Sequence, residues 1–178
     1  MKPNRKAARD FTVRTAEKRD LRAIVELRNK LDSHHRHPRI WPPEGGKKQN
    51  LSRYRQMLNQ STARLFVVES NGHKIVGYLA AVVQTRKCSD RDYRRAGAIS
   101  EAFVERRYRR HGIGRSLVEA ATRFFLKRKV RHITVRNVVF NKLANGFWER
   151  LSFRPVICTR TTNLYELTRA LQRRKHRS

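Results

Sequence analysis

The pattern of apolar and polar residues divides the first part of the chain into short, distinct elements. Phe11–Thr15 alternates apolar and polar side chains with a period of two, which predicts a strand. Apolar residues then recur at helical spacing over residues 21–31, and Asp20 stands where a carboxylate caps or begins a helix. Prolines and glycines interrupt Ser33–Gly46, so we expect a loop there, and Leu51–Leu58 predicts a second, short helix.

The middle of the chain predicts a hairpin and a further strand. Arg64–Glu69 and Ile75–Val83 are rich in β-branched and aliphatic residues, and the turn Ser70–Gly72 separates them. Arg86–Arg95 is polar and charged and is expected to cross the surface. Ala98–Val104 then predicts the next strand.

The last part of the chain predicts two helices and three strands. Helical periodicity covers Gly112–Lys129 and Asn141–Leu151, with a strand at His132–Val135 between them. Phe153–Cys158 and Asn163–Leu167 are expected to close the sheet as two strands. The resulting order predicts an α/β fold of mixed α+β type, in which helices pack on both faces of a mixed sheet.

Length and charge predict a single domain with basic ends. The 178 residues suffice for one domain, and 43 Lys and Arg against 14 acidic residues give a formal net charge of +29. The ends are almost purely basic, so we expect a domain over residues 11–168, a basic arm over residues 1–10 and a basic tail over residues 169–178. Such charge indicates either contact with a polyanion such as nucleic acid or the ribosome, or a solvated cationic surface, and both interpretations stay open.

Several classes of protein do not fit the sequence. It has no run of apolar residues long enough to span a membrane and no secretion signal. Cys88 and Cys158 lie far apart in the sequence, which predicts free thiols and the cytoplasm as compartment. The three histidines within His34–His37 lack ligands at matching spacing, so we expect no metal site.

The segment from Arg109 to Gly114 suits an anionic ligand. It lies between a predicted strand and a predicted helix, whose first N–H groups lack partners within the helix. Gly112 and Gly114 would let a pyrophosphate approach those N–H groups closely, and Arg115 adds charge nearby. The segment lacks the Gly-Lys-Ser/Thr ending of a Walker loop and the third glycine of the dinucleotide fingerprint. A tight turn without a ligand is the alternative.

Two motifs together resemble the signatures of the GNAT superfamily of N-acetyltransferases. Arg109-Arg-His-Gly112-Ile-Gly114 is similar to its acetyl-CoA motif, Gln/Arg-x-x-Gly-x-Gly/Ala, after a hydrophobic strand and an aromatic residue. Residues 141–153, Asn-Lys-Leu-Ala-Asn-Gly-Phe-Trp-Glu-Arg-Leu-Ser-Phe, resemble the second motif, Asn-x-x-Ala-x-x-Phe-Tyr/Trp-Glu-x-x-Gly-Phe. The resemblance implies a central, mostly antiparallel sheet of about six to seven strands flanked by about four helices.

The resemblance also implies a cofactor, acetyl-CoA, and a set of residues that bind it. In this family the cofactor's pantetheine lies along the strand that precedes the glycine turn. The implied cofactor-binding residues are Phe103, Val104, Arg109, Arg110, His111, Gly112, Ile113, Gly114, Arg115, Ser116, Asn141 and Trp148.

Two residues are the candidates for proton transfer. An alkyl amine is mostly protonated at neutral pH, so a group must take its proton before it can attack a thioester. Glu101, on the strand that would line the acceptor site, is our candidate base, with Glu105 as the weaker alternative; orientation of the substrate or pairing with a nearby Arg is the other role open to Glu101. Relatives often have a Tyr where this chain has Trp148, so Tyr108 or water is expected to protonate the leaving thiolate, unless the thiolate leaves unaided. Packing beside the turn is the other role open to Tyr108.

The sequence therefore predicts an enzyme, an N-acetyltransferase that moves an acetyl group from acetyl-CoA to a primary amine on a protein, peptide or small molecule. Direct attack within a ternary complex is the expected route. The alternative is a basic module that keeps the fold, associates with nucleic acid or the ribosome, and has weak or no catalysis. A monomer and a homodimer are both compatible with the sequence, and no membrane contact is expected.

Overall fold

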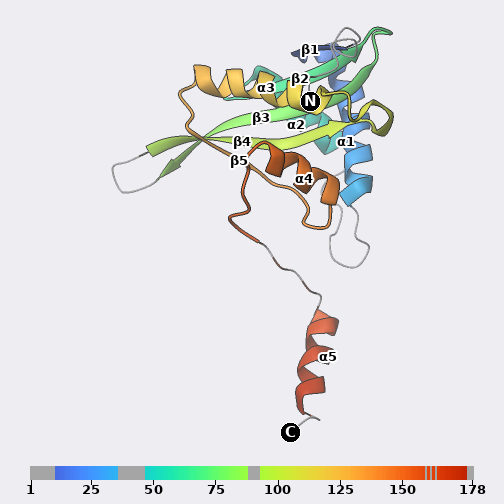
Figure 1. Cartoon of the computed structure of the whole chain (residues 1–178), viewed down its shortest axis with the longest axis vertical. Coiled ribbons are helices and arrows are strands. Elements are labelled where there is room, and N and C mark those ends of the chain that lie inside the picture. The colour runs from blue at the N-terminus through green and yellow to red at the C-terminus, as the bar shows by residue number, and fades with distance from the viewer. Residues whose placement is uncertain are drawn as a thin grey trace. The chain divides into compact units, whose positions relative to one another are not determined.

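One five-stranded sheet organises most of the chain. The computed structural model describes residues 11–35, 47–87, 93–158, 160, 162 and 164–175. The strands follow one another in the order β1-β2-β3-β4-β5 (Figure 1). Their bounds are β1 Phe11–Thr15, β2 Ala63–Ser70, β3 Ile75–Lys87, β4 Tyr93–Val104 and β5 His132–Val135. The first four strands pair antiparallel and β5 pairs parallel with β4, which confirms the predicted mixed, mostly antiparallel sheet.

Helices cover both faces of this sheet. On one face, α1 (Leu21–His35) and α2 (Lys47–Asn59) share a buried core with every second residue of the central strands, such as Leu65 and Val67 of β2. On the other face, α3 (Ile113–Lys127) packs its Phe124 ring edge-on against Phe66 of β2. The alternation along β2 thus divides the core into two layers, as predicted for a sheet with helices on both sides.

The contact between α3 and the sheet depends on a glycine in β4. A Cβ atom at Gly97 would lie 2.9 Å from the ring of Phe125, closer than such atoms approach in real structures. Phe125 is fully buried, so it has little room to move. The absence of a side chain at Gly97 therefore lets the aromatic ring of α3 lie directly on the strand.

The chain forms two compact units. The first contains Met1–Leu31 and Gly45–Arg136, and so the whole sheet with α2 and α3. The second contains Asp32–Glu44 and Asn137–Ser178, with α4 (Lys142–Arg150) and α5 (Leu164–Lys175). In the second unit Trp148 is buried and packs edge-on against Phe147 and Phe153.

The two predicted closing strands are wrong. Among the described residues, Phe153–Cys158 forms no strand, and Leu164–Leu167 lies within α5, so the sheet has five strands rather than six to seven. The reason lies in the spacing of apolar residues, because Leu164, Leu167 and Leu171 recur at helical intervals. Alternation over five residues was too short a signal to distinguish a strand from one turn and a half of helix.

Other boundaries differ from the predictions by several residues. Helix α1 continues to His35, beyond the expected start of the loop, and α2 begins at Lys47. Strands β3 and β4 extend into the predicted surface crossing, pairing Lys87 with Tyr93. Helix α5 crosses the predicted start of the tail at residue 169. The predicted arm (residues 1–10), most of the predicted loop (36–46) and the end of the tail (176–178) lie outside the described residues.

Candidate functional site

A bulge in β4 places Glu101 on the face of the sheet that α1 and α2 cover. Ala80 of β3 pairs with Glu101, but the next residue, Ala81, pairs with Ile99, so Ser100 is an extra residue in β4. Gly97 faces α3, whereas Ala80 belongs to the core beneath α1 and α2. Because side chains of paired residues share a face, the bulge turns Glu101 away from α3 and into the opposite layer.

The Glu101 carboxylate is buried among four donors. Its side chain is only 2% exposed, and Nη1 atoms of Arg28 and Arg53 lie 2.7 Å and 2.6 Å from its Oε1 atom. Its Oε2 atom accepts hydrogen bonds from the hydroxyls of Tyr54 and Tyr78, the latter at 2.9 Å. A carboxylate has about four acceptor positions, so these donors fill its capacity. Glu101 therefore joins α1, α2 and β3 as well as its own strand.

The two tyrosines of this cluster act as donors only. Burial first, and then the negative charge of Glu101, raises the pKa of both Tyr54 and Tyr78 above the usual value. Each hydroxyl therefore keeps its proton throughout the neutral range. Their rings also meet edge-on, with centroids 6.1 Å apart, which fixes the position of both hydroxyls.

Glu105, the weaker candidate base, lies just beyond the end of β4 and is also buried. It forms an ion pair with Lys30 of α1, and Arg107 lies 3.4 Å from its Oε2 atom. Burial favours the neutral carboxyl, but the hydrogen bond from Lys30 and the neighbouring cations outweigh it and hold the pKa of Glu105 below the usual value. Glu105 is thus a stable anion paired with lysine.

The edge of β4 opens beside Glu101. Within the described residues, β5 pairs with β4 only from Ala96 to Ile99, whereas β3 pairs with it as far as Val104. Residues 100–104 therefore have a strand partner on one side alone. Outward-facing backbone groups along such an edge can hydrogen bond to an extended ligand. Phe103, predicted to line the cofactor, turns its side chain into the core.

The predicted glycine turn has the geometry expected of an anion site. Gly112 adopts a left-handed conformation with φ of 80° and caps α3, and Arg110 is also left-handed at φ of 70°. The first helical bond runs from Ser116 N–H to the Gly112 carbonyl, so the N–H groups of residues 113–115 precede the helical ladder. A Cβ atom at Gly112 would meet no atom within 4 Å, so the space beside it is open.

The arginines around this turn differ in orientation. Arg109 points back toward the strand: its Nε atom donates to the Val104 carbonyl at 2.9 Å and its guanidinium lies over the Phe103 ring. Burial, and then the nearby Arg106, lowers the pKa of Arg109. Arg110 and His111 are exposed, and Arg115 pairs with Glu119 along α3. The structure brings these predicted residues to the N-terminal end of α3, and Arg109 contacts the end of β4.

Tyr108, the second candidate for proton transfer, lies in a short 3-10 helix, Arg106–Tyr108, that leads into the turn. Its ring meets Phe11 of β1 edge-on, with centroids 5.8 Å apart, and the Arg107 guanidinium lies over it. These contacts support the ring as part of the scaffold of the turn.

Asn141 and Trp148 belong to the second unit. Asn141 is the N-cap of α4, where its side-chain oxygen accepts from the Ala144 N–H at 3.1 Å. Trp148 is buried between its two aromatic neighbours. Both residues thus have structural roles within their unit, and their contact with the cofactor stays a prediction.

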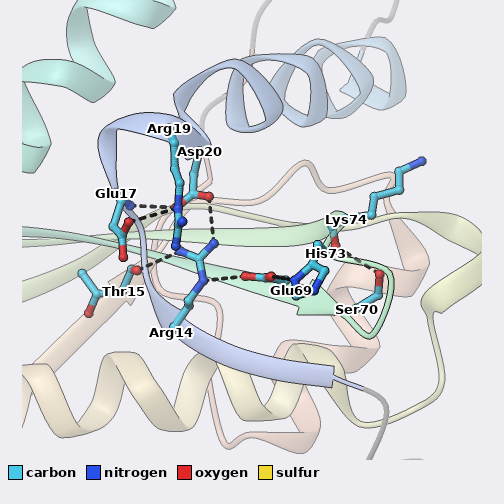
Figure 2. Close-up of polar contacts among 9 residues, drawn as sticks. All are labelled: Arg14, Thr15, Glu17, Arg19, Asp20, Glu69, Ser70, His73 and Lys74. Carbon is cyan, nitrogen blue, oxygen red and sulfur yellow. Dashed lines mark hydrogen bonds and ion pairs between the residues drawn. The ribbon is translucent and has the colours of Figure 1, made fainter.

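A second polar network ties β1 to the start of α1 and to the β2–β3 hairpin (Figure 2). Arg14 binds Asp20 through two parallel bonds of 2.7 and 2.9 Å and Glu69 through a third of 2.7 Å. Glu69 also contacts His73 at 2.8 Å. The network borders a cavity of about 550 Å³ that Lys30 and Glu105 also line. The donors of Arg14 are matched by the carboxylates of Asp20 and Glu69, so the evident role of this network is structural.

Sequence reasoning identified Glu101 but not the residues that surround it. Arg28, Arg53, Tyr54 and Tyr78 come from three elements, and no motif joins them. One signal was present in Tyr78, a hydroxyl in an otherwise aliphatic strand, and in Tyr54, which lies in a polar helix. Among the described residues, no group of three or more His, Cys, Asp and Glu side chains is placed to hold a metal ion. The described helices include none long and apolar enough to cross a membrane.

Comparisons with known proteins agree with this geometry. The model of the acetyltransferase (GNAT) family matches residues 24–153. No curated protein matches the sequence of the chain.

Solved structures share the fold at low sequence identity. The tetramutant of the BH1408 protein from Bacillus halodurans is 21% identical, with a TM-score of 0.72 over 86% of this chain and 99% of that one. Glucosamine-6-phosphate N-acetyltransferase from Arabidopsis thaliana is 18% identical, with a TM-score of 0.65 over 86% and 98%. Aminoglycoside acetyltransferase AAC(6')-Iy, in complex with a bisubstrate analog of CoA, is 18% identical, with a TM-score of 0.67 over 84% and 97%.

These findings confirm the resemblance read from the two motifs, and with it the predicted fold class and the N-acetyltransferase class of enzyme. The predicted cofactor agrees with the family, since solved structures of AAC(6')-Iy hold CoA or a bisubstrate analog that contains CoA.

Proposed function

This chain belongs to the acetyltransferase (GNAT) family, and from that premise we propose that it transfers an acetyl group from acetyl-CoA to a primary amine within a ternary complex. The observation that carries the proposal is the continuity between the open edge of β4 and the glycine turn at the start of α3. These two features suit an extended ligand that ends in a diphosphate. The strand edge offers backbone hydrogen bonds to the extended part, and the turn offers N–H groups to the diphosphate.

The chain's own residues would hold the cofactor in two ways. The first-turn N–H groups of α3, with Arg110, His111, Arg115 and Ser116 around them, would hold the pyrophosphate. The open edge of residues 100–104 would hold the pantetheine. When bound, acetyl-CoA supplies the activated acetyl group. Val104 offers its N–H there, while its carbonyl accepts from Arg109.

Glu101 is the proposed acceptor of the amine proton. Its carboxylate lies on the strand whose edge would hold the thioester, which places a proton acceptor close to the reacting amine. The four donors already fill the Glu101 carboxylate, so an incoming ammonium can bind it only by taking the place of one of them. Arg53, whose side chain is 46% exposed, is the donor that can move, because both tyrosines are fully buried. Tyr108 or water is the proposed donor to the leaving thiolate.

A double variant that adds two negative charges at the turn tests binding of the cofactor. We expect Gly112→Glu with Gly114→Glu to abolish CoA binding measured by calorimetry, because two carboxylates would repel the pyrophosphate and the side chain at residue 112 would enter the open space beside the turn. Gly72→Glu, in the exposed hairpin turn, is the matched control and should bind CoA like the parent. Unchanged CoA affinity in the folded double variant would refute the proposed site.

The charge of the chain favours an alternative function. A net charge of +29 attracts polyanions, and α5 carries Arg169, Arg173, Arg174 and Lys175 within one short helix. A basic module on nucleic acid or the ribosome, with weak or no catalysis, is therefore the alternative. We propose the cytoplasm as the compartment, because Cys88 and Cys158 lie far apart in the sequence without metal-like spacing, a pattern typical of thiols in reducing surroundings.

A further inference from the structure

The Glu101 cluster carries more positive than negative charge. Two guanidinium groups, of Arg28 and Arg53, contact one carboxylate, so these three side chains together carry a charge of +1. Tyr54 and Tyr78 contribute no charge, because burial and Glu101 raise their pKa values. A site of this kind does not favour an acceptor that brings only positive charge, because each added ammonium would meet an excess of guanidinium.

The two guanidinium groups differ in their freedom to exchange partners. The Arg28 side chain is 14% exposed and that of Arg53 is 46% exposed. Both reach the same oxygen, Oε1 of Glu101, whereas the tyrosines occupy Oε2. Arg53 can therefore swing away without leaving the carboxylate bare, since three donors remain.

A guanidinium has five N–H donors in a planar fork that fits carboxylate and phosphate groups. Among the described residues, Arg53 contacts Glu101 through Nη1, and half of its side chain faces solvent. Most of its donors are thus available to an anion on a ligand. Arg53 and Glu101 together form an ion pair whose two members can each take a new partner of opposite charge.

We propose that the acceptor is zwitterionic: a primary ammonium with a carboxylate or phosphate a few bonds away. This inference rests on the proposed acetyltransferase function. The anion of the acceptor binds Arg53 and draws it from Glu101 Oε1, and the ammonium of the acceptor takes the position that Arg53 leaves at that oxygen, beside Arg28. Because the zwitterionic part of the acceptor brings one charge of each sign, the exchange adds no net charge to the cluster, and it brings the amine to the carboxylate that accepts its proton. Arg53 is a specificity-determining residue in this scheme.

Matched pairs of acceptors test the proposal directly. We would measure kcat/KM for acetyl transfer to L-lysine and cadaverine, to L-phenylalanine and phenethylamine, and to glucosamine 6-phosphate and glucosamine. Each pair differs by one anionic group, and the pairs separate carboxylates from phosphates. A charge-assisted pair predicts a preference of about tenfold or more for the anionic member of at least one pair.

Variants at Arg53 identify the residue responsible. Arg53→Gln should remove the preference by lowering kcat/KM for the member that carries the anionic group much more than for its purely cationic counterpart, and Arg53→Lys should keep part of it. Arg55→Gln, on the exposed face of the same helix, is the matched control and should leave the preference unchanged. Circular dichroism and the melting temperature establish that each variant is folded.

The outcomes separate this inference from the proposed function. A parent enzyme that binds acetyl-CoA but uses the members without an anionic group equally well, or uses no member of the panel, would overturn the zwitterionic acceptor alone. A preference that survives in Arg53→Gln would overturn the role of Arg53. Failure of the parent to bind acetyl-CoA would overturn the proposed function itself.

Discussion

Single side chains in this protein have well-defined partners, and Asp20 shows what one residue contributes. It is 4% exposed, accepts two bonds from Arg14 and a third from the Glu17 N–H at 2.7 Å, and stands at the start of α1. It therefore joins β1 to the helix that covers the sheet. Burial favours the neutral form, but these donors outweigh it and hold the pKa of Asp20 below its usual value.

This lowered pKa predicts how stability depends on pH. A carboxyl whose pKa is depressed by folding stabilises the native state above its unfolded pKa of about 4, and loses that effect as the pH falls through its folded pKa. We expect Asp20→Asn to lower the free energy of unfolding by about 2–4 kcal/mol at pH 7. The difference from the parent should shrink toward pH 3 in urea melts.

The control for this prediction is an exposed acid. Glu119 pairs with Arg115 on the surface of α3, and Glu119→Gln should change stability by less than about 1 kcal/mol at either pH. An Asp20→Asn effect that is equally large at pH 7 and pH 3 would show that ionisation of Asp20 is not its source.

At the scale of elements, variants at the N-cap of α4 can distinguish a structural role of Asn141 from a functional one. Asn141 caps this helix in the structure and was predicted from sequence to contact the cofactor. Asp caps a helix as well as Asn does, whereas Ala does not. We expect Asn141→Asp to keep the parent's stability and Asn141→Ala to lose about 1 kcal/mol in urea unfolding.

The same variants test the cofactor contact. If Asn141 also reaches CoA, the new charge of Asn141→Asp should weaken CoA binding about tenfold in calorimetry, by repulsion of the phosphates. Asn71→Asp, in the hairpin turn, adds the same charge elsewhere and serves as control. Parent-like CoA affinity in Asn141→Asp would restrict Asn141 to the cap.

Elements with strong local signals were predictable from the sequence, and those that depend on distant partners were not. The hairpin of β2 and β3 and the glycine turn before α3 each follow from short-range chemistry. The bulge at Ser100 cannot be read from the strand alone, because it is defined by the residues opposite. The Glu101 cluster was missed for the same reason: sequence placed the carboxylate, while its partners come from α1, α2 and β3.

At the scale of the whole molecule, the charge of +29 predicts salt-dependent binding to nucleic acid. Affinity for a single-stranded RNA should fall steeply as salt rises. Replacing Arg169, Arg173, Arg174 and Lys175 with Gln should reduce the slope of log affinity against log salt by up to about 3, since each phosphate contact contributes about 0.7. Fluorescence anisotropy over a range of salt concentrations measures this slope.

The matched control removes the same charge from the first unit, at Arg22, Arg55, Arg123 and Lys127, all of which are exposed. Equal slopes in both quadruple variants would mean that net charge, not α5, governs binding. An affinity of the parent that does not change with salt would contradict polyanion contact altogether.

The open edge of β4 has a consequence for the chain when no cofactor is bound. Backbone groups of residues 100–104 that lack a strand partner can pair with any extended peptide, including the same edge of another copy. A cationic surface of this size keeps copies apart, because two such chains repel each other before their edges meet. We therefore expect the excess of arginine and lysine to oppose self-association through this edge, an effect that concentrated salt would weaken and that a bound cofactor would make unnecessary.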